Sequence, residues 1–214
     1  MSEYYDRNYR RFLPADRNAP IIDIGCGDGD FVRYAHGLGY RNITAVDIDH
    51  EALAPLARLD GVRVIAEPAD GPFVRTLPDH YGLIVVKQMI YYLTRREAPA
   101  FAAALRDKLA EDGVLLVEVY NASLASARFT QSKDPFIQTA YNEKGLTRLL
   151  ESQGLTVSEL FGAAFAPGSI GRKIYVLLGK VWFRLWRAIL ILERGRDDEL
   201  PVIRSKSIIV IARR

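Results

Sequence analysis

Short apolar runs alternate along the chain with segments whose apolar residues recur at helical spacing. The runs predict strands at 20–25, 42–47, 62–66, 82–86 and 114–119. The run at 82–86 is continuous, which is typical of a strand buried on both faces of a parallel sheet. Helical spacing predicts helices at about 28–38, 50–57 and 96–110. Strands that alternate with helices predict an α/β fold, in which helices cover both faces of a mostly parallel sheet.

The pattern changes after residue 119. Residues 120–141 are polar and predicted to be irregular, and Asn142 is the predicted N-cap of a helix that ends near Gly154. Two more strands are predicted at 155–161 and 206–212, with an extension at about 162–204 between them. No repeat or linker divides the chain, so we expect one domain over 1–214 with a helical extension before the last strand.

The first residues form an aromatic and charged segment. Tyr5, Tyr9 and Phe12 recur at roughly helical spacing, which predicts a short helix that packs on the domain or covers a cofactor. The segment has no apolar signal-peptide core, so the cytoplasm is the expected compartment.

Composition narrows the classes of function. Of 214 residues, 49% are hydrophobic and 26% are charged, which indicates a folded domain. A net charge of +3 is too small to indicate a nucleic-acid partner. The one cysteine, Cys26, lies between two glycines, where a small side chain fits, and we interpret it as structural. Neither a disulfide nor a metal site is expected, since no cluster of His, Asp and Cys has ligand spacing.

Candidate chemistry begins where the first predicted strand meets a glycine-rich turn. Residues 23–29 read Asp-Ile-Gly-Cys-Gly-Asp-Gly, and a helix is predicted to follow. A dinucleotide site requires Gly-x-Gly-x-x-Gly, but Asp30 occupies the last position. Asp28 would repel a pyrophosphate, although it would tolerate a ligand that carries a sulfonium and an ammonium group. The second strand ends at Asp47, about 20 residues on, where related folds bind ribose hydroxyls.

This set of motifs resembles the class I S-adenosylmethionine (SAM)-dependent methyltransferases, over about residues 18–161 and the final strand. The resemblance implies a Rossmann-like sheet of seven strands with the last one antiparallel, SAM as the cofactor, and methyl transfer as the reaction. In it the glycines would surround the methionine part of SAM, Asp23 would brace the loop or the ammonium group, and Asp47 would bind the ribose. Either Glu67 or Asp70, in a predicted acidic turn, would lie by the adenine. The implied cofactor-binding residues are Asp23, Gly25, Cys26, Gly27, Gly29, Asp47, Ile48, Glu67, Asp70 and Gln88.

A narrower similarity concerns the acceptor. Segments 118–122, 134–135 and 142–146 are loosely similar to methyltransferases encoded with bacterial polysaccharide and O-antigen synthesis, which implies O-methylation of a small molecule, a sugar or a glycan intermediate. Those enzymes often carry Asp-Pro-x-His, but this chain has no histidine there. Asp134, as a general base, and Tyr120 are the candidate catalytic residues, and a plain turn residue is the alternative for Asp134.

Two further functions stay open at this point. One is methylation of a quinone or lipid-like acceptor, and the other is a SAM-binding module without catalysis.

Residues 172–192 are the most unusual part of the extension. Four cations fall on one narrow helical stripe: Lys173, Lys180, Arg184 and Arg187. The rest of the helix surface is apolar or aromatic and includes Trp182 and Trp186. Three cations in mid-segment argue against a spanning helix. The helix either roofs the acceptor pocket as a lid or lies at a membrane interface.

Overall fold

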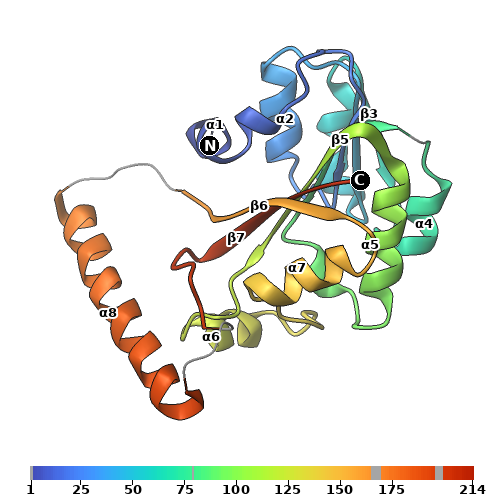
Figure 1. The fold of residues 1–214 in the computed structure, drawn as a ribbon. Helices are drawn as coiled ribbons and strands as arrows, with labels where there is room; N and C mark the ends of the chain where they lie inside the picture. Colours follow the sequence, from blue (N-terminus) through green and yellow to red (C-terminus); the bar gives the residue numbers. More distant parts are fainter. Residues whose placement is uncertain (1, 79, 165–169, 196–199) are drawn as a thin grey trace.

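A seven-stranded sheet forms the centre of the computed structural model, which describes residues 2–78, 80–164, 170–195 and 200–214 (Figure 1). The strand order is β3-β2-β1-β4-β5-β7-β6. Strands β1 to β5 pair in parallel, whereas β7 runs antiparallel to both of its neighbours. The predicted fold is therefore confirmed. The bounds are β1 (Ile21–Ile24), β2 (Ile43–Asp47), β3 (Val62–Ala66), β4 (Tyr81–Lys87), β5 (Leu109–Tyr120), β6 (Thr156–Gly162) and β7 (Ser207–Arg213).

Helices cover both faces of the sheet. One face carries α1 (Ser2–Asn8), α2 (Asp30–Gly37) and α3 (His50–Leu53), and the other carries α4 (Gly71–Thr76), α5 (Glu97–Lys108) and α7 (Glu143–Glu151). Alternate residues of each strand enter the two cores because successive side chains point to opposite faces. In β1, for example, Ile22 and Ile24 pack with α5, whereas Ile21 packs with α2.

The N-terminal segment folds as its aromatic spacing predicts. Helix α1 is followed by a short 3-10 turn, Arg10–Phe12, and the side chains of Tyr5 and Tyr9 are 2% and 1% exposed. The amide of Asn8 anchors the segment, since it donates to the carbonyl of Ala164 and accepts from the Ala164 N–H. A helix packed on the domain is thus confirmed.

Some elements differ from the prediction for identifiable reasons. The second helix is shorter than expected: α3 ends at Leu53 and a 3-10 turn follows Pro55, which lacks the N–H that a continuous helix needs. The expected acidic turn at 67–72 leads into α4, because the Asp70 side chain caps the Phe73 N–H. Strand β5 begins at Leu109, since Leu109 already pairs with Tyr81.

The segment expected to be irregular, 120–141, contains a short helix, α6 (Ala127–Lys133). The predicted N-cap after this segment is confirmed, because the Asn142 side chain caps α7 by accepting from the Gly145 N–H.

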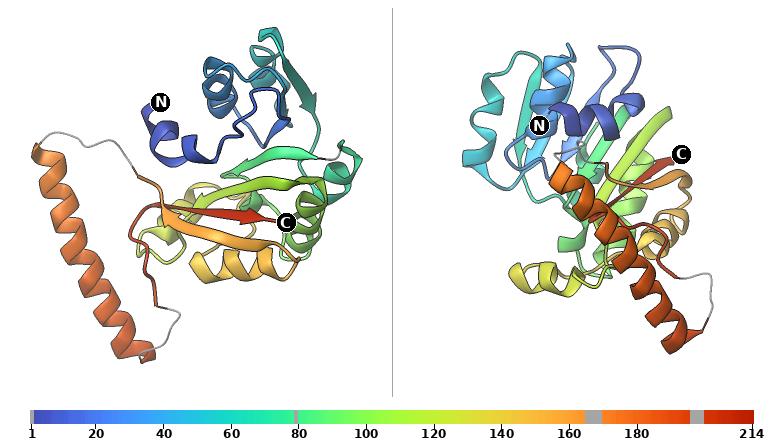
Figure 2. Two further views of the ribbon diagram at one scale, coloured as in Figure 1. Left: turned by 45° about the horizontal axis from the view of Figure 1, so that its top comes forward. Right: turned by 90° about the vertical axis from the view of Figure 1, so that its left-hand side faces the viewer.

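The extension contains one long helix, α8 (Ile170–Arg194), which stands away from the sheet (Figure 2). Its described side chains run from Val176 to Glu193, so Lys173 lies outside them, as do residues 165–169 and 196–199 of the expected extension. In the described part of the chain, no helix is both long enough and apolar enough to cross a membrane.

Candidate active site

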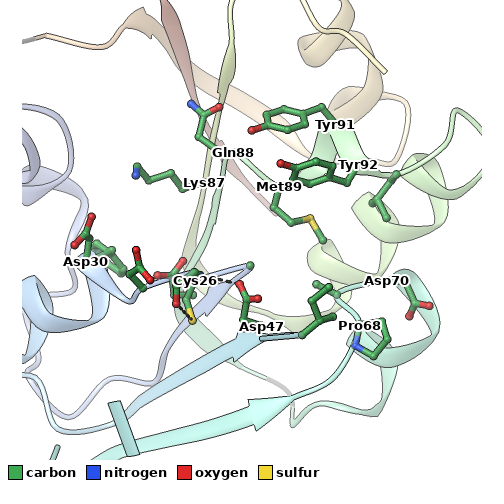
Figure 3. A pocket seen from close by; sticks show the side chains of 18 of the residues that line it. Cys26, Asp30, Asp47, Pro68, Asp70, Lys87, Gln88, Met89, Tyr91 and Tyr92 are labelled. Carbon is green, nitrogen blue, oxygen red and sulfur yellow. Dashed lines mark hydrogen bonds between the residues drawn. The ribbon is translucent and has the colours of Figure 1, made fainter. Parts of the chain in front are cut away.

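A cavity of about 550 Å³ opens at the carboxyl ends of β1 to β4 (Figure 3). Ligands of open α/β sheets bind at this edge. Eight of the ten predicted cofactor residues line the cavity: Asp23, Gly25, Cys26, Gly27, Asp47, Ile48, Asp70 and Gln88. The other two, Gly29 and Glu67, do not.

The glycine loop contains one glycine that faces open space. Gly25, Gly27 and Gly29 all have positive φ angles, of 73°, 50° and 73°. A Cβ on Gly25 would come within 2.6 Å of Met89, and one on Gly29 within 2.4 Å of Leu56, so these two positions are closed by packing. A Cβ on Gly27 would meet no atom within 4 Å. Gly27 is therefore where the backbone is bare toward the cavity, which leaves room for a ligand to approach.

Asp47 holds the loop in place. Its Oδ2 accepts the Gly27 N–H at 2.7 Å, and its Oδ1 accepts the Asp49 N–H at 3.1 Å. The carbonyl of Val46 accepts the N–H groups of Gly25 and Cys26. The end of β2 thus positions the loop that follows β1, and a carboxylate still has lone pairs left for a ligand hydroxyl.

The two acidic residues of the turn before α4, Glu67 and Asp70, differ in position. Asp70 lines the cavity while one of its oxygens caps α4. Glu67 lies in a separate surface depression beside Arg63 and Phe73. Asp70 is therefore the carboxylate of this pair that a ligand in the cavity can reach.

Asp23 is a buried acid at the floor of the cavity. Asp23 is only 2% exposed, and its carboxylate oxygen Oδ1 has no hydrogen-bond partner among the described residues. Burial raises the pKa of Asp23 to about 7; nearby Lys87 lowers it, and the Asp47 and Asp30 carboxylates raise it further. A cationic group bound here would favour the ionised form.

Gln88 adopts a strained backbone conformation where β4 ends. Its φ is 56°, which is uncommon for a residue other than glycine. The side-chain amide donates to Glu118 Oε1 and to Ser207 Oγ, each at 3.2 Å, and the Gln88 N–H donates to the Glu118 carbonyl at 2.8 Å. The amide oxygen, Oε1, is buried without a partner among the described residues.

Glu118 connects this position to the N-terminal helix. The residue is 2% exposed and accepts the hydroxyl of Tyr4 at 2.7 Å and that of Tyr9 at 2.5 Å. Tyr5, between these two tyrosines, lines the cavity. The N-terminal helix is consequently part of the cavity wall.

Several residues of the cavity escaped the sequence analysis as site residues, among them Tyr5, Lys87, Tyr91 and Tyr92. The Lys87 ammonium lies 5.8 Å from the centre of the Tyr5 ring. For Lys87 a usable signal existed, because it is the last residue of a buried strand and immediately precedes Gln88. For Tyr5 the helical spacing of the N-terminal aromatic residues offered a helix over the cofactor as one of two alternatives.

A tyrosine cluster forms the rim opposite the glycine loop. Tyr91 and Tyr92 line the cavity, and the Tyr92 hydroxyl donates to Asp134 Oδ2 at 2.7 Å. Burial and this hydrogen bond raise the pKa of Tyr92 to about 12, so its phenol is neutral at pH 7. Asp134 Oδ1 accepts the Phe136 N–H at 3.0 Å, as in a turn.

Neither candidate catalytic residue touches the cavity directly. Asp134 lies behind Tyr92, and Tyr120 stacks on Tyr91 with ring centres 5.5 Å apart. The role of Asp134 as a general base stays a prediction, and its carboxylate is linked to the cavity through the Tyr92 hydroxyl.

Comparison with known proteins identifies the family. The profile of the methyltransferase domain family matches residues 1–160. The chain belongs to this family. The extension, β7 and the C-terminal residues follow the matched part in the sequence.

Solved structures share the fold of this methyltransferase. A SAM-dependent methyltransferase from Archaeoglobus fulgidus is 17% identical with a TM-score of 0.67, and the match covers 100% of this chain and 95% of that one. One from Mesorhizobium loti is also 17% identical with a TM-score of 0.67, covering 100% and 98%. The 1,6-didemethyltoxoflavin-N1-methyltransferase of Burkholderia thailandensis, solved with bound 1,6-didemethyltoxoflavin and S-adenosylhomocysteine, is 18% identical with a TM-score of 0.58, and the match covers 92% of this chain and 72% of that one. No curated protein sequence matches the chain.

The predicted enzyme class, a methyl-transferring enzyme, is confirmed by the family, and SAM as the cofactor agrees with these findings.

Proposed function

We propose that this methyltransferase, as one domain over 1–214, transfers a methyl group from SAM to an oxygen of a small molecule, a sugar or a glycan intermediate. The observation that carries the proposal is the cavity, in which the bare face of Gly27 and the loop anchored by Asp47 stand opposite the Tyr91–Tyr92 rim. One side has the features of a cofactor cradle and the other those of an acceptor wall.

The residues present fit SAM. A Cβ would fill the open space at Gly27, and the orphaned Asp23 oxygen suits a cationic partner. Asp47 would hold the ribose hydroxyls and Asp70 would lie by the adenine. Asp23 would face the ammonium group, and the free amide oxygen of Gln88 would face the methionyl part. When bound, SAM supplies a methyl group already activated by its sulfonium charge.

The first test of this assignment is Asp47→Ala. We expect it to weaken SAM binding by about 1.5–3 kcal/mol, the range for hydrogen bonds to a charged group. Part of the loss comes from the loop, because the Gly27 N–H loses its acceptor. Titration calorimetry measures the affinity, with Glu67→Ala as the matched control outside the cavity. Equal affinity of both variants and the wild type would remove Asp47 from the cofactor site.

On the acceptor side we propose a proton relay. An acceptor hydroxyl within reach of Tyr92 would pass its proton to the phenol oxygen, while the phenol proton moves to Asp134 Oδ2. Tyr92 stays neutral throughout, in keeping with its raised pKa. Asp134 then acts as a positioning residue and final proton acceptor, rather than as a group that touches the acceptor.

Asp134→Asn should lower turnover by roughly tenfold to a hundredfold with SAM affinity unchanged, because an amide cannot take up the proton. Tyr92→Phe removes the same hydrogen bond, so the double variant should be no slower than the slower single variant. Initial rates across a pH series measure the effect. If Asp134 had only a structural role, the Asp134→Asn variant would keep the pH profile of the wild type. If Asp134→Asn keeps wild-type turnover, Asp134 is only a turn residue.

Transfer to a cell extract tests the whole proposal. The full chain is incubated with methyl-labelled SAM and extract, and products one methylene heavier are sought in the aqueous and the organic fractions. Label in polar sugars or glycans supports the first acceptor class, as does the narrower sequence similarity. Label in organic-soluble products that carry no sugar would favour the alternative, a quinone or lipid-like acceptor, which the exposed apolar side chains of α8 support. SAM binding without any transfer would indicate a binding module. The cytoplasmic location stays a prediction.

A further inference from the structure

Helix α8 presents a broad apolar face to solvent. We call Leu178, Val181, Trp182, Leu185, Ile189 and Leu192 the docking face. These six side chains recur at the spacing of one helical stripe. They are between 43% and 86% exposed. Exposed apolar surface of this extent marks a site of contact with another molecule or with a membrane.

The docking face is distinct from the side of α8 that contacts the rest of the chain. The indole N–H of Trp186 donates to the Ser123 carbonyl at 3.1 Å, and the Arg204 guanidinium donates to the Val176 carbonyl at 3.2 Å. Trp186 and Phe183 are half-buried. Leu178 and Trp182 also line a groove that α8 shares with residues 124–126, and both side chains stay more than half exposed. The rest of the docking face lies outside this groove.

Helix α8 also carries positive charge, on a stripe separate from the docking face. Lys180 and Arg184 lie one helical turn apart on a separate stripe, both exposed, and no ion pair involves them among the described residues. The sequence has no acidic residue from 170 to 192. A helix with an apolar face that includes tryptophan and with cations on its polar side is typical of one that lies in a membrane interface.

The charge distribution also decides between a membrane and a second copy of this chain. Pairing two copies of α8 would bring together two cationic stripes that have no acidic residues between 170 and 192 to neutralise them. An anionic lipid surface supplies the missing negative charge.

Helix α8 stands at the same edge of the sheet as the cavity. Ser123 follows β5 and Arg204 precedes β7, and the pairing of Tyr120 with Ser207 places both segments at the carboxyl end of β5. The helix lies beside this edge in both views of Figure 2. A surface that holds α8 therefore lies near the edge where the cavity opens.

We propose that α8 docks the enzyme on an anionic membrane surface, with the docking face in the headgroup boundary and Lys180 and Arg184 toward the lipid phosphates. The docking also bears on the acceptor: the enzyme would methylate an amphiphilic or lipid-linked molecule presented at that surface. This part of the inference rests on the proposed function. The lid interpretation of this helix is not supported, because no described residue of α8 lines the cavity.

Co-sedimentation of the full chain with vesicles tests the docking. The vesicles contain either phosphatidylcholine alone or phosphatidylcholine mixed with phosphatidylglycerol. The wild type should pellet with the anionic vesicles at low salt, and much less with the neutral ones or at high salt. Trp182→Ala combined with Leu185→Ala should lower the partition coefficient at least tenfold. The control, Val202→Ala, changes an equally exposed apolar residue outside the helix and should bind as the wild type does.

Further variants and controls separate membrane docking from loss of the fold and from pairing of two copies. Lys180→Gln with Arg184→Gln should weaken binding and flatten its salt dependence. Circular dichroism and SAM calorimetry on each variant show that the fold and the cofactor site are intact, so failed docking is distinguishable from a failed function. Absence of sedimentation with anionic vesicles at low salt would overturn the docking. A dimer in light scattering that the Trp182 and Leu185 changes dissociate would overturn it too, in favour of an interface between copies.

Discussion

Gly27→Val should abolish measurable SAM binding while the sheet stays folded. The branched side chain would enter the one part of the glycine loop where a Cβ meets no protein atom within 4 Å, which is the face we assign to the cofactor. We expect a loss of at least a hundredfold in affinity, or about 2.7 kcal/mol. Titration calorimetry of SAM measures this loss, and thermal unfolding shows how much stability the variant retains.

A matched control separates filling of the site from backbone strain. Gly39 also has a positive φ, of 93°, and a Cβ there also meets nothing within 4 Å, but it lies beyond α2 and outside the cavity. Gly39→Val should therefore lose stability as Gly27→Val does, because both place a branched residue in the left-handed region. It should bind SAM as the wild type does. If the two variants bind SAM alike, the open face of Gly27 is not the cofactor cradle.

Asp23→Asn should change how stability depends on pH. Burial raises the pKa of Asp23 from its ordinary 3.8 to about 7, so the folded protein holds a proton that the unfolded chain releases between these values. The resulting stabilisation is complete below about pH 4 and is lost as the pH rises through 7. The span from 3.8 to about 7 corresponds to about 4 kcal/mol.

Denaturant unfolding of the SAM-free protein, between about pH 4 and pH 8, measures this prediction. The free energy of unfolding of the wild type should fall relative to that of Asp23→Asn as the pH rises, since the amide does not titrate. Parallel curves for the two proteins would show that Asp23 ionises normally in the fold.

The same carboxyl group links cofactor binding to proton release. A cationic group beside Asp23 favours the carboxylate, so SAM should displace the proton below about pH 7 and bind more tightly as the pH rises toward that value. Calorimetry in buffers of different ionisation enthalpy counts the protons released. Asp23→Asn should release none through this group and should bind SAM more weakly at pH 8. At high pH, Asp23→Asn would then raise the free energy of unfolding relative to the wild type while lowering the affinity for SAM.

Local features of this chain were readable from its sequence. The apolar runs predicted the strands because a buried parallel strand needs consecutive apolar residues. The glycine loop and Asp47 were also predictable, since the loop follows the first strand, Asp47 ends the second, and the carboxyl ends of parallel strands share one edge. Asn142 was readable as a cap because capping joins residues three positions apart.

What remained undetermined joins residues that are distant along the chain. The positions of Glu67 and Asp70 depend on how the chain passes from β3 into α4: Asp70, which caps α4, lines the cavity, whereas Glu67 lines a separate depression. Asp134 reaches the site only because Tyr92, 42 positions earlier, lies between it and the cavity.

By itself, the sequence determined the strands and the glycine loop, because these depend on short spacings and on burial, which periodicity records. The antiparallel last strand was an implication of the family resemblance that these motifs carry. Only the tertiary structure decided that the N-terminal helix is part of the cavity wall. Tyr4 and Glu118 are 114 positions apart, and no periodic pattern encodes such a pair. It likewise decided which face of α8 is free, since an apolar stripe looks the same in sequence whether a core or a lipid surface covers it.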